Sequence, residues 1–151
     1  MTDLRALLTT IVDANRYMTL ATADETGRPW ASPVWFATAD YCELFWVSKP
    51  EARHSRNLAV RPALGIVIFD STQPPGTGRG VYLEATAREV PESELERGLA
   101  VFAQASEADG AGAWGRSDLE PPARLRLYHA LAAEHFVLSA GDERLPVQLS
   151  T

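Results

Sequence analysis

The sequence predicts a mainly β protein with a few α-helices, folded as a small antiparallel barrel. Short segments that alternate apolar and polar residues recur between turn-forming sequences, and few segments show helical spacing. Short strands linked by hairpins close readily into a small barrel. The 151 residues contain no internal repeat and no linker, so we expect one domain over residues 1–151.

The N-terminal half predicts one helix followed by three strands. Apolar residues recur at helical spacing within residues 3–15: Leu4, Leu7, Leu8, Ile11 and Val12. Residues 17–24 then alternate in the manner of a strand and end in the turn-forming sequence DETG. A second strand is expected over residues 28–38 and a third over residues 42–48, with TADY as the turn between them.

The remaining segments predict further strands and one longer helix. Residues 63–70 are β-branched and apolar on both faces, which favours a central strand, and residues 80–90 alternate as a fifth strand. The Pro- and Gly-rich sequence between them indicates an exposed loop. Residues 91–105 predict a helix that starts with Pro91 and acidic residues. After an irregular segment, residues 124–149 predict two or three more strands.

The composition excludes several classes of function. The net charge of −6 argues against a general nucleic-acid surface, and no apolar run is long enough to span a membrane. A single cysteine, Cys42, excludes an intramolecular disulfide and fits a reducing compartment. His129 and His135 lack the spacing and the partners of a metal site. We therefore expect a cytoplasmic protein with no nucleic-acid partner, no membrane partner and no bound metal ion.

The sequence SKPEARHSRNL, residues 48–58, is basic within an acidic chain. It contains the only lysine, Lys49, together with Arg53, His54 and Arg56. Ser48 and Glu51 have the spacing of a capping box, which predicts a helix that begins here and runs to about residue 60. The free N–H groups of such a helix terminus favour an anion.

The helical spacing also predicts which side chains share a face. Arg53, Arg56 and Asn57 are expected on one face, while Leu58 and Ala59 are expected to point toward the core. This face is consistent with a phosphate site. It is also consistent with a solvated surface whose arginines pair with nearby carboxylates.

The second predicted strand is unusual because it contains Pro29 and Pro33, which cannot donate to a sheet ladder. Aromatic residues are concentrated on this strand and the next: Trp30, Trp35, Phe36, Phe45 and Trp46. Either these rings pack in the core, or some of them border a planar ring that carries a phosphate tail.

Several motifs in order resemble one known family. They are GRPWASPVWF at residues 27–36, a third strand that ends at Ser48, RHSRNL at residues 53–58 and GVYLEATA at residues 80–87. Together they resemble the pyridoxamine 5′-phosphate oxidase-like split-barrel family of flavin-binding proteins. The resemblance implies a six-stranded antiparallel split β-barrel, a homodimer, and FMN bound in the groove between subunits.

The resemblance also implies which residues hold the cofactor. Arg53 and His54 match basic positions on the FMN phosphate, and an adjacent dianion would favour protonated His54. In the family, the end of one strand approaches the FMN phosphate and ribityl chain. The matching residues in this sequence are Val47, Ser48 and Lys49. The flavin edge is matched by the strand Ser32, Pro33, Val34 and Trp35. Catalytic residues are not identifiable, because the flavin ring itself carries the hydride.

The function expected from this resemblance is an FMN-dependent oxidoreductase that acts on a small organic substrate not identified by the sequence. One alternative is a reductase that uses the deazaflavin F420. The longer tail of F420 would need a more extended basic groove, which could be formed by Lys49, Arg53, Arg56 and Arg61. Another is a non-catalytic flavin- or haem-binding protein. In a haem protein, His54, His129 or His135 could be the axial ligand.

Overall fold

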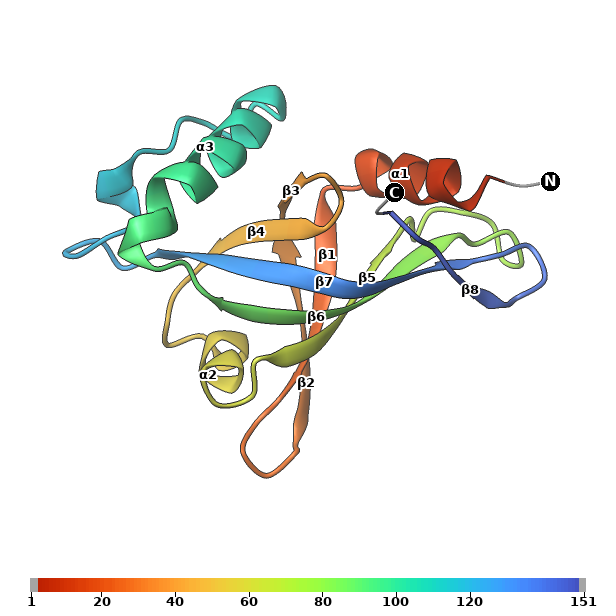
Figure 1. The fold of residues 1–151 in the computed structure, drawn as a ribbon, viewed down its shortest axis with the longest axis horizontal. Coiled ribbons are helices and arrows are strands. Elements are labelled where there is room, and N and C mark those ends of the chain that lie inside the picture. The colour runs from red at the N-terminus through yellow and green to blue at the C-terminus, as the bar shows by residue number, and fades with distance from the viewer. Residues whose placement is uncertain (1–2, 150–151) are drawn as a thin grey trace.

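The computed structural model describes residues 3–149 and shows a curled antiparallel sheet with three α-helices packed around it (Figure 1). The strands are β1 (Tyr17–Ala23), β2 (Pro29–Trp35), β3 (Ala37–Ala39), β4 (Glu43–Ser48), β5 (Ala63–Phe69), β6 (Gly80–Glu89), β7 (Arg126–Leu138) and β8 (Arg144–Pro146). The helices are α1 (Leu4–Ala14), α2 (Arg53–Val60), α3 (Glu92–Ala108) and the short 3₁₀ helix η1 (Arg116–Asp118). Within the described residues, no helix is long and apolar enough to cross a membrane.

The predicted mainly β class is confirmed, and the curled sheet is consistent with a split barrel. The sheet has eight strands in the order β2-β1-β5-β6-β7-β4-β3, with β8 paired to β7. β3 and β8 are only 3 residues long. The other six strands are longer, and they correspond to strands that the sequence predicts. β2 lies at an edge of the sheet, where its prolines cost no hydrogen bond to a second neighbour.

The core divides into two clusters on either side of the sheet. The larger cluster fills the barrel and includes Leu20, Trp46 and Ile68. The smaller cluster lies beneath α3 and includes Phe45 and Leu127. A Cβ atom on Gly98 of α3 would lie 2.9 Å from Leu127 Cδ2 and 3.0 Å from Phe45 Cε1. Glycine at this position therefore lets α3 approach the sheet closely.

A charged network fixes α3 over β4 and β7. Arg97 Nη1 donates to Glu43 Oε1 at 3.0 Å, and His129 Nε2 lies 3.0 Å from the same oxygen. The Arg97 hydrogen bond, with help from His129 and against the effect of burial, holds the pKa of Glu43 below its usual value. The network therefore ties α3 to the sheet strands beneath it.

The capping-box prediction is wrong. α2 begins at Arg53, its N-cap is Ala52, and no side chain caps it. Ser48 is instead the last residue of β4, and Pro50 lies in the turn that follows. The hydroxyl of Ser48 is hydrogen-bonded to His54, so it is not available to the helix terminus.

The predicted faces of α2 also need correction, although Leu58 is buried as expected. Asn57 is only 4% exposed and donates through Nδ2 to Thr22 Oγ1 at 3.0 Å, so it does not share a solvent face with Arg56. Ala59 is exposed. The reason is that α2 packs against β1, β2 and β6 through the face that includes Asn57 and Leu58, which leaves Arg56 and Ala59 exposed.

Candidate functional site

A cavity of about 540 Å³ lies where β2, the end of β4, the start of α2 and α3 meet. We call it the aromatic cavity. It is lined by Tyr17, Pro33, Val34, Trp35, Val47, Ser48, His54, Phe102, Ser106, Ala111, Trp114 and Leu125. The structure thus brings together the predicted residues Pro33, Val34, Trp35, Val47, Ser48 and His54. This volume is within the range of ordinary ligand sites, roughly 300–1,000 Å³.

Three aromatic side chains form one wall of this cavity. The Trp35 and Phe102 rings meet edge to face with centroids 5.1 Å apart, and Phe102 meets Trp114 in the same way at 5.5 Å. Trp35 Nε1 donates to Asp109 Oδ2 at 3.1 Å, which holds the indole against the end of α3. The wall is therefore fixed in position, and it offers flat apolar surfaces to a planar ligand.

The same cavity is also lined by a buried polar pair. Ser48 Oγ and His54 Nε2 are hydrogen-bonded at 2.8 Å, and the two residues are 9% and 8% exposed. Burial lowers the pKa of His54, so the imidazole is neutral at pH 7 in this structure. His54 also lies in the first turn of α2, whose N-terminal N–H groups have no side-chain cap. An anionic group is favoured here by the helix terminus, but not by a charge on His54.

The remaining predicted residues do not line the aromatic cavity. Lys49 is exposed, and Ser32 is half-buried on β2. The Arg53 guanidinium lies over the Trp30 ring, with Cζ 4.2 Å from the ring centroid. Arg53 and Lys49 are adjacent in sequence to His54 and Ser48, which do line the cavity.

Sequence reasoning missed the part of the cavity that α3 and the following segment supply. Phe102 and Ser106 lie on α3, and Ala111, Trp114 and Leu125 follow it. The sequence predicted this second segment as irregular without assigning it a role. The available signal was Trp114, a single large aromatic residue within a Gly- and Ala-rich stretch.

The three histidines occupy different environments, and only His54 lines the aromatic cavity. His129 is bonded to Glu43, and His135 Nε2 donates to the Tyr41 carbonyl oxygen at 2.8 Å. Across residues 3–149, no three His, Cys, Asp or Glu side chains are grouped to hold a metal ion. Of the three histidines suggested as axial ligands of a haem, His54 is the one that the aromatic cavity presents.

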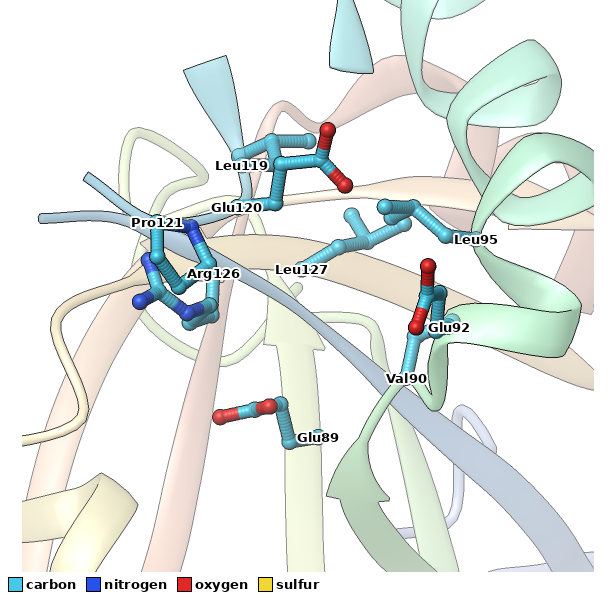
Figure 2. A pocket seen from close by; sticks show the side chains of 9 residues that line it. All are labelled: Glu89, Val90, Glu92, Leu95, Leu119, Glu120, Pro121, Arg126 and Leu127. Atoms are coloured by element: carbon cyan, nitrogen blue, oxygen red, sulfur yellow. The ribbon is translucent and has the colours of Figure 1, made fainter. Parts of the chain in front are cut away.

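A separate cavity of about 260 Å³ lies beside the first turn of α3 (Figure 2). Glu89, Glu92 and Glu120 surround an apolar floor that includes Leu119 and Leu127. The Arg126 guanidinium at its edge donates to two backbone carbonyls, those of Ala123 and Leu125. The carboxylates disfavour an anionic cofactor here, so this cavity is not the phosphate site that the sequence predicts.

The buried, neutral state of His54 makes a prediction about pH. Its pKa is lowered in the folded chain, so below about pH 6.5 the unfolded chain binds a proton that the folded chain does not. We expect the free energy of unfolding of the wild type to fall relative to His54→Gln as pH decreases from 7 to 5. The slope is at most about 1.4 kcal/mol per pH unit. Urea unfolding at several pH values measures it, and parallel curves for the two proteins would show that His54 is not held neutral.

The chain matches the family described as Pyridoxamine 5'-phosphate oxidase over residues 4–132. Comparison with curated proteins gives no significant match. Among solved structures, HutZ, the haem storage protein from Vibrio cholerae, is 27% identical with a TM-score of 0.69, covering 90% of this chain and 95% of HutZ.

Two further structures resemble this one in fold. A haem-binding protein from Mycobacterium smegmatis is 20% identical with a TM-score of 0.76, covering 99% of this chain but only 59% of that chain. An FAD-binding protein from Mesorhizobium loti is 18% identical with a TM-score of 0.63, covering 91% and 94%. The family match extends over most of the chain, and the protein belongs to the pyridoxamine 5′-phosphate oxidase family.

Proposed function

We propose that this protein binds haem in the aromatic cavity, as a haem-binding member of its family rather than as an enzyme. The observation that carries the proposal is the cavity itself, which is lined by a fixed aromatic wall and by the buried His54. A neutral imidazole has the lone pair that coordination to iron requires. HutZ, described as a haem storage protein, supports the choice because it matches at 27% identity over nearly its whole length.

The residues present fit a planar ring with anionic arms. Trp35, Phe102 and Trp114 would contact the ring, and His54 would bind the iron, with its Nε2 giving up the hydrogen bond to Ser48 if that nitrogen is the one that binds. The uncapped start of α2, with Arg53 and Lys49 beside it, would bind the carboxylates. Bound haem would supply iron that binds small ligands or exchanges electrons, and the apolar walls would exclude water from it.

FMN is the second candidate cofactor, and a specific observation favours it. Pro33, Val34, Trp35, Val47, Ser48 and His54, which match the flavin-contacting positions of the family, converge on this one cavity. An FMN phosphate would be bound by the same uncapped helix terminus. With FMN bound, the protein would be an oxidoreductase whose substrate is not identified.

A matched pair of arginine variants tests how the cofactor is bound. Arg53→Ala should weaken haem binding at least about tenfold, because a charge-assisted contact is worth about 1.5–3 kcal/mol. Arg56→Ala removes the same charge from an exposed position on the same helix and should change the affinity less than about twofold. Both affinities come from absorbance titration of the purified chain with haem. Equal losses in the two variants, or no loss in either, would contradict the assignment.

We also propose that the protein is a homodimer through the outer face of β1, β2 and β5. These strands contain no Asp, Glu, Lys or Arg, and their outer face includes Tyr17 and Phe69, which are 61% and 51% exposed. Small residues lie between them, and Ala21 is paired with Ala31 on one side and Gly65 on the other. An apolar face of this kind favours association with a second copy. Tyr17, Pro33 and Trp35 also line the aromatic cavity, so the partner would border the cofactor.

The dimer is tested by placing a charge at the centre of this face. Ala21→Asp should convert the dimer to a monomer, because a carboxylate buried between two copies would lose its hydration. Ala100→Asp introduces the same charge on the exposed side of α3 and should remain dimeric. Light scattering at micromolar concentration gives the masses. A monomeric wild type, or a dimeric Ala21→Asp variant, would rule out this interface.

A further inference from the structure

One wall of the aromatic cavity consists of a single stretch of chain. Residues 109–115, which we call the lid segment, join α3 to η1 and turn back beside α3 (Figure 1). Ala111 and Trp114 of this segment line the cavity. Residues 109–113 are all exposed, so solvent lies on the other side of the segment. The lid segment therefore separates this side of the cavity from solvent.

The backbone of the lid segment has few close neighbours. Gly110 and Gly112 have φ values of +69° and +96°, which glycine adopts without strain. Among the residues that the structure describes, a Cβ atom on either glycine would meet nothing within 4 Å. The one large side chain of the segment is Trp114, whose ring meets Phe102 edge to face. A movement of the segment would therefore disturb little packing beyond this aromatic contact.

Several hydrogen bonds of the lid segment are made to the end of α3. The Ala111 N–H donates to the Ser106 carbonyl oxygen at 2.8 Å, and Ser106 Oγ donates to the Gly112 carbonyl oxygen at 2.8 Å. These bonds do not tie the segment to the sheet. Within residues 3–149, the side-chain hydrogen bond that does so runs from Trp35 Nε1 on β2 to Asp109 Oδ2, at 3.1 Å.

The hydrogen bond between Trp35 and Asp109 is suited to open and close. It lies near the surface, because Asp109 is exposed and Trp35 is only half-buried. Water can replace either partner in such a bond, so its net contribution to stability is small. The N-terminal half of α3 is held separately, since Gly98 packs closely on the sheet and Arg97 is bonded to Glu43. The Asp109 bond can therefore open while this half of α3 stays in place.

We propose that the lid segment is a gate to the aromatic cavity, and that the hydrogen bond from Trp35 to Asp109 is the latch that keeps the gate closed. The proposal rests on the assignment of this cavity as the cofactor site, and it adds the route by which the ligand enters and leaves. Loops that close over a ligand commonly set the rate of its entry and release. Because the proposed dimer partner would border the cavity along β2, a gate at the lid segment offers a route that leaves the dimer intact.

The test measures the rates of haem binding to the full chain. Asp109→Ala removes the acceptor of the latch and should raise both the association and the dissociation rate constant by about two- to tenfold, the factor that corresponds to the net contribution of one hydrogen bond. Asp109→Asn keeps an acceptor oxygen and should behave like the wild type. Glu107→Ala removes the same charge from an exposed position at the same helix end and should also behave like the wild type. Stopped-flow absorbance gives the association rate, and transfer of haem to excess apomyoglobin gives the dissociation rate.

A second measurement examines the latch in the cofactor-free protein. The indole proton of Trp35 should exchange with water faster in Asp109→Ala than in the wild type or Asp109→Asn, as measured by NMR. Equal exchange in all three proteins would show that the latch does not exist.

Two kinetic results would overturn the gate. One is faster dissociation of haem from Asp109→Ala with unchanged association, which would mean that Asp109 only supports the wall around a bound ligand. The other is an equal acceleration in Glu107→Ala, which would assign the effect to charge. A wild type that binds no haem would contradict the proposed function instead, and the same rates are then measured with FMN. Binding of neither haem nor FMN would overturn both proposals.

Discussion

The hydrogen bond between Ser48 and His54 determines how this fold makes its cavities. It joins the last residue of β4 to the first turn of α2 at 2.8 Å, in surroundings that are nearly dry. Because a buried polar group without a partner is costly, the strand end and the helix cannot separate without loss of stability. One turn further along α2, Asn57 is bonded to Thr22 of β1. These two bonds hold the helix across the end of the barrel, where His54 borders the aromatic cavity.

The position of α2 also indicates how an acidic chain could hold the anionic group of the proposed cofactor. The overall charge is −6, yet Lys49, Arg53 and Arg56 lie within or next to a helix terminus that has no side-chain cap. Helix N–H groups and nearby cations act over short distances, and salt screens the more distant carboxylates. The acidic side chains gather elsewhere, for example around the cavity beside α3 shown in Figure 2. The proposed anion site would therefore depend on local electrostatics and not on net charge.

Much of the fold could be predicted from the sequence, because alternation and turn residues are local signals. The edge position of β2 agrees with its two prolines, and the central position of β5 agrees with its apolar sequence. The predicted start of α2 was wrong. Ser48 and Glu51 have the spacing of a capping box, but the Ser48 hydroxyl is hydrogen-bonded to His54 instead of to the helix terminus. Local spacing cannot distinguish these two uses of a serine. The burial of Asn57 could not be predicted from the sequence either, because it depends on the packing of β1 against α2.

The site was predictable only where it depends on nearby residues. β2, the end of β4 and the start of α2 were identified through their motifs, and the structure brings six of their residues to one cavity: Pro33, Val34, Trp35, Val47, Ser48 and His54. The wall from α3 was missed because it depends on distant pairs such as Trp35 and Asp109, which are 74 positions apart. The spacing of apolar and polar residues along the sequence does not indicate a contact between positions so far apart. Binding of a planar cofactor beside His54 is tested most directly by the absorption spectrum of the freshly purified protein before and after incubation with haem or FMN. We expect a Soret band that shifts in His54→Ala, and a protein that binds neither chromophore would rule out the proposed site.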